Sequence, residues 1–182
     1  MDKLMVQAVA GAGKTTFLLN QLNLENNVAL ITYTKNNQEQ LKENIIKKFG
    51  YYPNNIHVFG LFEFLYNFCY RPLQNKYPIT GICFDHPSPY LKGFHHKDGR
   101  IYSNQISRLL LAEKINYLTR IERFFDYFYI DEVQDIAADD FDWLMSLKDL
   151  KIPVTLVGDF YQSTFVSSRR GNKGKAIYSS IE

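Results

Sequence analysis

Long apolar runs, paired cysteines and a strong excess of one charge are all missing from this sequence. No stretch approaches the roughly 18 apolar residues of a membrane-spanning helix, and the first residues, MDKLMVQAVA, lack the pattern of a signal peptide. The two cysteines, Cys69 and Cys83, are too few for a disulfide framework and lack the paired spacing of a zinc site. These absences favour a soluble, cytoplasmic protein with reduced thiols and no membrane partner.

Charge and aromatic content constrain the function less. The net charge of +2 permits nucleic-acid binding but is lower than in dedicated basic proteins. The aromatic share of 15% comes almost wholly from Tyr and Phe, which form cores more often than stacking platforms. With 182 residues and 46% hydrophobic content, the chain has the size and composition of one globular domain, or of a domain with an insertion.

Apolar runs alternate with helical patterns along most of the chain. Runs rich in branched and aromatic residues predict strands at 4–9, 27–34, 55–59, 125–132 and 153–159. The patterns between them predict helices at 15–24, 36–50, 61–70, 103–122 and 139–150. This alternation predicts an α/β fold, in which a parallel sheet carries helices on both faces.

The segment 71–100 interrupts this alternation. Its four prolines and several glycines predict a looped insertion with one strand at 79–84. The helical pattern then resumes, with Ser103 or Asn104 as a possible cap. The expected organisation is one domain formed by 1–70 and 101–182, into which 71–100 is inserted.

A phosphate-binding loop is predicted between the first strand and the first helix. AVAGAGKTTF, residues 8–17, follows the pattern A-x-x-x-x-G-K-T, with Ala8 in place of the usual first glycine. Glycines let the backbone turn tightly and direct N–H groups at phosphate oxygens, and the helix adds the positive end of its dipole. The predicted nucleotide site comprises Ala10, Gly11, Ala12, Gly13, Lys14, Thr15 and Thr16.

Two side chains of this loop have specific expected roles. Lys14 would reach the β- and γ-phosphates of ATP, and Thr15 would hold Mg²⁺ through its hydroxyl. The alternative is a glycine-rich turn that carries a surface lysine. The position of the motif between a strand and a helix favours phosphate binding.

Two further strands are predicted to end in acidic residues. YFYIDEVQD places Asp131 and Glu132 at the carboxyl end of a strand, the edge at which open α/β sheets bind ligands. Asp131 is the candidate metal ligand opposite Thr15, and Glu132 is the candidate base that activates water; helix capping is the alternative. In TLVGDFYQSTF, Asp159 ends another strand and Gln162 follows, where its amide could hydrogen-bond the γ-phosphate or the attacking water.

Together these motifs resemble those of superfamily 1 helicases of the UvrD/Rep type. AGAGKTT, DEVQD and VGDFYQSTF are similar to motifs I, II and III in order and strand context. The resemblance implies a RecA-like first motor domain, a P-loop ATP hydrolase that uses ATP and Mg²⁺. It implies that Lys14, Glu132 and Gln162 are catalytic and that Thr15 and Asp131 hold the metal.

The same resemblance implies contacts with single-stranded DNA. ALITYTKNNQEQLKENI is similar to motif Ia, and IHVFGLFEFL resembles the next segment of the DNA path. Thr32, Thr34 and Phe59 thereby become candidate DNA contacts, and Lys35 could supply positive charge beside them.

The expected activity is ATP hydrolysis of the DNA-helicase type. The second RecA-like domain, with its arginine fingers and motifs IV to VI, has no counterpart in these 182 residues. We therefore expect weak activity until a second domain or a partner chain completes the site. Two alternatives stay open: a nucleotide-dependent module that switches its affinity for a partner protein, and a phosphotransferase in which 71–100 forms an arginine-bearing lid. The DEVQD sequence disfavours the second.

Overall fold

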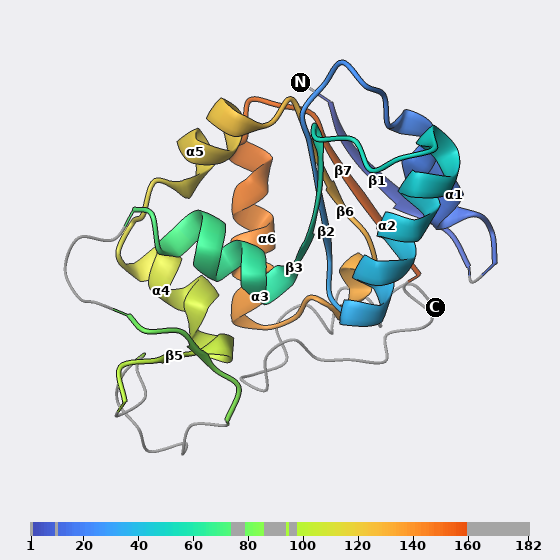
Figure 1. The fold of residues 1–182 in the computed structure, drawn as a ribbon. Coiled ribbons are helices and arrows are strands. Elements are labelled where there is room, and N and C mark those ends of the chain that lie inside the picture. The colour runs from blue at the N-terminus through green and yellow to red at the C-terminus, as the bar shows by residue number, and fades with distance from the viewer. Residues whose placement is uncertain (1, 10, 74–78, 86–93, 95–97, 160–182) are drawn as a thin grey trace.

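A central parallel sheet organises the chain (Figure 1). The computed structural model describes residues 2–9, 11–73, 79–85, 94 and 98–159. Five strands lie in the order β1-β7-β6-β2-β3, and every pairing is parallel. Their bounds are β1 Lys3–Gln7, β2 Val28–Thr32, β3 Ile56–Gly60, β6 Tyr127–Ile130 and β7 Val154–Gly158. The predicted α/β class is confirmed.

Helices cover both faces of this sheet, as predicted (Figure 1). One face carries α1 (Lys14–Gln21) and α2 (Lys35–Phe49). The other face carries α3 (Leu61–Glu63), the π-helix η1 (Phe64–Tyr70), α4 (Ile106–Ala112), α5 (Tyr117–Phe124) and α6 (Asp139–Ser146). Short 3₁₀ turns join these elements at η2 (Ser103–Gln105), η3 (Val133–Asp135) and η4 (Leu147–Asp149).

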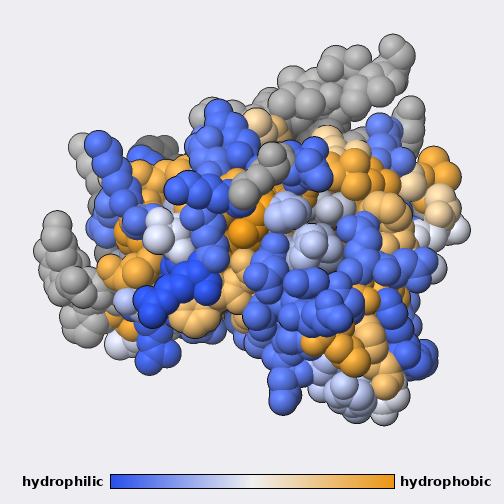
Figure 2. Space-filling view, turned by 90° about the horizontal axis from the view of Figure 1, so that it is seen from above, coloured by the Kyte–Doolittle hydropathy of each residue, from blue (hydrophilic) through white to orange (hydrophobic). Residues whose placement is uncertain are grey.

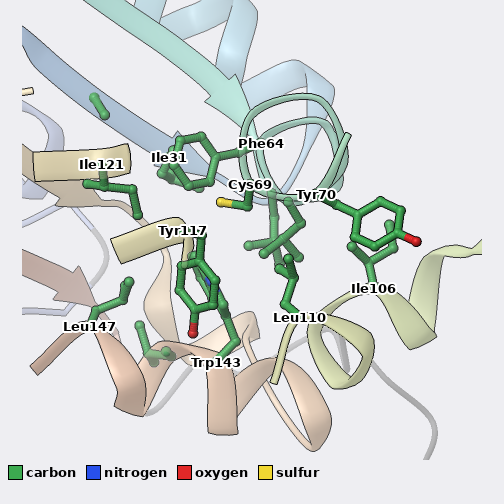
Figure 3. Close-up of a cluster of buried hydrophobic side chains, with 14 of the residues drawn as sticks. Ile31, Phe64, Cys69, Tyr70, Ile106, Leu110, Tyr117, Ile121, Trp143 and Leu147 are labelled. Atoms are coloured by element: carbon green, nitrogen blue, oxygen red, sulfur yellow. The ribbon is translucent and has the colours of Figure 1, made fainter. Parts of the chain in front are cut away.

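The two faces of the sheet have separate hydrophobic cores. On β2, Leu30 packs with the α1 and α2 side chains, and Ile31 packs with the opposite group, which includes Phe64 and Trp143 (Figure 3). All five residues of β2 are buried. A strand that is covered on both faces has apolar residues at successive positions, so β2 could be recognised as a strand from its sequence.

Much of the aromatic excess is in the larger core. The rings of Phe64 and Phe68 stack at 5.0 Å, and Phe64 also contacts Phe128 and Trp143. All four side chains belong to one connected cluster of buried and partly buried residues. Packing, rather than an exposed stacking platform, therefore accounts for these rings.

The predicted helix at 103–122 is wrong, because the chain forms two helices there. α4 ends at Ala112 and α5 begins at Tyr117. Between them Lys114 takes a φ of 51°, and the Asn116 side chain accepts a hydrogen bond from the Thr119 amide at 3.3 Å, which caps α5. Neither Ser103 nor Asn104 caps a helix through its side chain.

The described part of the insertion contains one short strand. β4 (Ile82–Cys83) pairs in parallel with β5 (Ile101–Tyr102), so the strand predicted at 79–84 is only two residues long. Much of the rest of 71–100 lies outside the described residues. None of the described helices is long and apolar enough to cross a membrane.

The strands begin at the upper edge of the sheet in Figure 1 and end at the lower edge. Viewed from above, hydrophilic residues cover most of the visible surface, with separate hydrophobic areas between them (Figure 2). The glycine loop and the acidic residues follow the opposite, carboxyl ends of the strands. That edge holds the candidate site.

Candidate nucleotide-binding site

Three neighbouring strands bring the predicted nucleotide residues to one edge. The glycine loop follows β1, Asp159 follows β7, and Asp131 and Glu132 follow β6. Adjacent strands are about 4.8 Å apart. The ends of β1 and β6 are therefore roughly 10 Å apart, with β7 between them.

The loop after β1 has the backbone that its glycines predict. Gly11 and Gly13 take φ values of 77° and 83°, and Gly13 is the N-cap of α1. A Cβ built on Gly11 would meet no atom within 4 Å, so the conformation, rather than crowding, requires glycine there. The Ala12 amide donates to the Val9 carbonyl at 3.1 Å.

Lys14 folds back over this loop. Its ammonium donates to the Ala8 carbonyl at 3.1 Å and lies 3.8 Å from Oδ2 of Asp159. Thr15 and Thr16 follow in α1, half-buried and exposed respectively. The cation is thus already inside the loop, where a phosphate would meet it.

Asp131 is a buried carboxyl group, with 4% of its surface exposed. Burial, and then the neighbouring Glu132 charge, raise the pKa of Asp131 to about 6, and Lys14 opposes this shift. Its Oδ1 accepts the Glu132 amide at 3.0 Å. A divalent cation would offset the buried charge, so the group fits a metal ligand.

Asp131 and Thr15 are the candidate magnesium ligands. Within the described ranges, no group of three or more His, Cys, Asp or Glu side chains is arranged to hold a metal. Mg²⁺ is commonly bound through one or two protein oxygens together with phosphate oxygens and water. Asp131 and the Thr15 hydroxyl are the residues that could supply those protein oxygens.

Glu132 has a strained backbone. Its φ and ψ are 55° and 46°, in the left-handed region that non-glycine residues seldom occupy. Such a conformation costs on the order of 1–3 kcal/mol and occurs preferentially at functional sites. The turn η3 follows directly, and the Asp135 amide closes it by donating to the Glu132 carbonyl at 3.1 Å.

Gln134 is a site residue that the sequence patterns did not single out. Its Nε2 donates to Oε2 of Glu132 at 2.5 Å, and its Oε1 accepts the Asp159 amide at 2.9 Å. A Cβ on Gly158 would lie 2.6 Å from Oε1 of Gln134, so a side chain at this position would displace the Gln134 carboxamide. The one available signal was its place inside DEVQD.

Three of the four candidate DNA contacts lie close together in the chain, at the end of β2 and the start of α2. Thr34 caps α2 by accepting the Asn37 amide at 3.2 Å, and the exposed Lys35 begins that helix at the same carboxyl edge. Thr32 ends β2, with a buried hydroxyl that has no hydrogen-bond partner in the described part of the chain.

Phe59 has a different environment from these three residues. It lies within β3, and its ring is 5.3 Å from that of Phe64 and 6.2 Å from that of Phe125. These contacts give it a packing role. A contact between Phe59 and DNA stays a prediction.

Two predicted site residues, Ala10 and Gln162, lie outside the described residues. The other nucleotide-site residues occupy the loop after β1, the start of α1 and the end of β6. No family model and no curated protein matches this chain. A functional assignment therefore rests on the geometry of the site and on the motifs themselves.

Proposed function

We propose that this chain is the N-terminal, RecA-like ATP-binding domain of an ATP-dependent DNA helicase or translocase. One observation carries the proposal. A lysine-bearing glycine loop follows one strand, and the acidic pair Asp131 and Glu132, of which Asp131 is buried, follows another. These two strands are separated only by β7, and Lys14 lies against Asp159 at the end of β7. A glycine-rich surface turn would not need acidic groups at this place.

The loop and Lys14 would bind the phosphates. The left-handed glycines shape the loop, and the Lys14 ammonium supplies a positive charge with little solvent contact. Thr15 and Asp131 would hold Mg²⁺. When bound, this ion neutralises charge on the phosphates and orients them for attack by water.

Glu132 would accept a proton from the attacking water. Its carboxylate is on the β6 side of the site, across β7 from Lys14. β7 lies between β1 and β6, so the ends of the strands that precede the phosphate loop and Glu132 are roughly 10 Å apart. An acidic group opposite the phosphate loop favours hydrolysis over transfer to another acceptor.

Single-stranded DNA would bind beside the nucleotide, along the ends of β2 and β3. β2 pairs directly with β6, and the Asp131 amide donates to the Ile31 carbonyl at 2.9 Å. Thr34 and the exposed Lys35 follow β2 at once. These groups could contact a phosphate backbone one strand away from the metal ligand.

A nucleotide titration tests the first part of the proposal. We expect Lys14→Ala to abolish binding of a fluorescent ATP analogue in the presence of Mg²⁺, because the phosphates lose their main cation. Lys47→Ala, which changes an exposed lysine of α2, is the matched control and should bind normally. Unchanged affinity in Lys14→Ala would contradict the phosphate-loop assignment.

Steady-state hydrolysis tests the second part. Turnover that rises with single-stranded DNA and disappears in Glu132→Gln would support a motor site. Binding that depends on Lys14, without turnover, would support a half-site that a second domain completes. Phosphate passed to an acceptor instead of released would contradict the proposal and favour a phosphotransferase. A nucleotide-dependent change of affinity for a protein, with no effect of DNA, would favour the switch module.

A further inference from the structure

Both ends of the Gln134 carboxamide are engaged at the candidate site. Nε2 contacts the Glu132 carboxylate, and Oε1 accepts the backbone N–H of Asp159. We propose that Gln134 is a positioning residue that fastens the Glu132 carboxylate to the end of β7. The inference rests on the proposed function only for its effect on ATP hydrolysis.

The chemistry of the bridge calls for glutamine. An ionised carboxylate accepts hydrogen bonds only, and a backbone amide donates only, so the residue between them must offer a donor and an acceptor. Gln134 has both on one rigid amide group, and it is only 4% exposed. Glutamate would keep the acceptor but would face Glu132 with a second carboxylate, and methionine would fill the space with neither group.

Backbone geometry brings the two ends of the bridge together. The left-handed conformation of Glu132 turns the chain sharply, and η3 holds the next three residues in a tight 3₁₀ turn. Gly158 lets Gln134 approach β7, because any side chain there would collide with it. The strained backbone of Glu132 and the absence of a side chain at Gly158 therefore both allow the Gln134 bridge to form.

The bridge connects the two sides of the site. Asp159 gives its amide to Gln134, and its carboxylate lies 3.8 Å from the Lys14 ammonium. A displacement of β7 relative to β6 would therefore move the Glu132 carboxylate together with the residue beside Lys14. Glu132 would keep its place with respect to the phosphate loop through Gln134.

A chemical-shift experiment on the nucleotide-free chain tests the bridge directly. We expect Glu132→Ala to move the backbone amide resonance of Asp159, because Gln134 contacts both the Glu132 carboxylate and this amide. In a Gln134→Met background, the same Glu132→Ala change should leave the Asp159 resonance in place. The proposal would be overturned if Glu132→Ala left the Asp159 resonance unchanged in the native background. It would also be overturned if Glu132→Ala moved this resonance equally in the native and the Gln134→Met backgrounds.

Gln105→Met supplies the matched control. Gln105 is also a buried glutamine, with 1% exposure, but it lies in η2, where its amide nitrogen donates to Oδ1 of Asn104 at 3.5 Å. In this background Glu132→Ala should still move the Asp159 resonance by its full amount. Loss of the response in Gln105→Met as well would mean that any buried glutamine supports it, which would contradict a specific role for Gln134.

Hydrolysis then tests the consequence of the bridge. In single-turnover reactions with excess protein, Gln134→Met and Gln134→Glu should slow hydrolysis about 100-fold, because misplacing a reacting group by about 1 Å costs that much. Their Kd for Mg-ATP should stay within about twofold, because Lys14 and the loop are unchanged. A weaker Kd with an unchanged rate would overturn the positioning role. Native chain that binds no nucleotide would contradict the proposed function instead, and the chemical-shift result would still decide the bridge.

Discussion

Asp131 is a buried carboxyl group whose shifted pKa makes folding stability depend on pH. Its pKa rises from 3.8 to about 6, mainly through burial and secondly through the charge of Glu132. At pH values between these two, the folded chain holds a proton that the unfolded chain has released. Folding stability should therefore be highest below this window and should fall as the pH rises through it.

We predict that removing this carboxyl removes that pH dependence. Without Mg²⁺, the native chain should lose on the order of 3 kcal/mol of unfolding free energy between pH 4 and pH 7 relative to Asp131→Asn. Urea midpoints of the two proteins across this range provide the measurement. Parallel curves for the two proteins would show that Asp131 does not carry the shifted pKa.

Gly158 and Gly50 allow two reasons for glycine to be compared. A Cβ at Gly158 would lie 2.6 Å from Oε1 of Gln134 and 2.8 Å from Cγ1 of Val133, whereas one at Gly50 would meet nothing within 4 Å. Gly50 instead has a φ of 80° at the end of α2. An added side chain would therefore be crowded at Gly158, whereas at Gly50 it would strain the backbone.

We predict distinct effects for alanine at these two glycines. Gly50→Ala should cost about 1–2 kcal/mol of unfolding free energy through its left-handed backbone and leave nucleotide binding unchanged. Gly158→Ala should cost about 1–3 kcal/mol through overpacking and should also disturb hydrolysis, because it displaces Gln134. Denaturant unfolding and single-turnover assays measure the two effects. Normal hydrolysis by Gly158→Ala would contradict this account.

Among the elements, α2 is preceded by an N-cap residue that has two possible roles. Thr34 caps the helix and is also a candidate DNA contact. Asn116 caps α5 in the same way, on the Thr119 amide, at a helix with no predicted DNA role. Comparing substitutions at Thr34 and Asn116 therefore distinguishes the effect of losing a helix cap from the effect of losing a DNA contact.

We predict that alanine at either cap lowers stability to a similar extent. Thr34→Ala and Asn116→Ala should each cost about 1 kcal/mol of unfolding free energy, because one helix amide loses its partner. Only Thr34→Ala should also weaken single-stranded DNA binding, and Thr34→Ser should restore both properties. Fluorescence anisotropy with labelled DNA is the measurement. Equal DNA affinity in all three variants would limit Thr34 to its capping role.

The two cysteines lie in elements of very different size. Cys69 belongs to η1 in the larger core (Figure 3), and burial raises the pKa of its thiol well above the ordinary value. Cys83 is also buried and free, but it lies in the two-residue strand β4. Short elements open locally at lower free energy than core elements.

We predict different alkylation kinetics for these thiols. Cys83 should react through local opening, whereas Cys69 should react only at the rate of global unfolding, because its thiolate is disfavoured and its element is central. Peptide mass spectrometry after timed iodoacetamide labelling follows each site separately. Equal rates in native conditions would mean that β4 opens only together with the whole domain.

At the scale of the whole molecule, β1 is an edge strand in the described sheet. It pairs with β7 on one side, and Leu4 and Met5 are 45% and 53% exposed. These two side chains also line an apolar groove of about 370 Å³. Its other apolar lining residues include Phe141, Leu144 and Met145. Exposed apolar edge strands promote association between chains.

We predict that a charge on this edge reduces self-association. Met5→Lys should lower the fraction of associated chain in sedimentation velocity at high concentration, because a lysine on an edge opposes pairing. Ile46→Lys, on α2 at 44% exposure, is the control for added charge alone. An equal reduction in both variants would show that net charge, rather than the β1 edge, governs association.

Several features of the fold follow from local patterns in the sequence. Apolar runs such as 28–32 end where a strand leaves the core, so glycines, acids and hydroxyls that follow them fall on the carboxyl edge of a parallel sheet. Gly11 and Gly13 take the left-handed conformation expected of a tight loop. The positions of Asp131 and Glu132 directly after β6, and of Lys14 after the glycine loop at the start of α1, were predictable for this reason.

The sequence by itself therefore determined the α/β class, the main strands and which residues end them, because these depend on the burial of local runs. The tertiary structure decided what those residues touch. β7 is the last described strand in the chain, yet it lies between β1 and β6, and this order places Asp159 against Lys14 and against Gln134. Strand order depends on packing between distant segments, which no local pattern encodes.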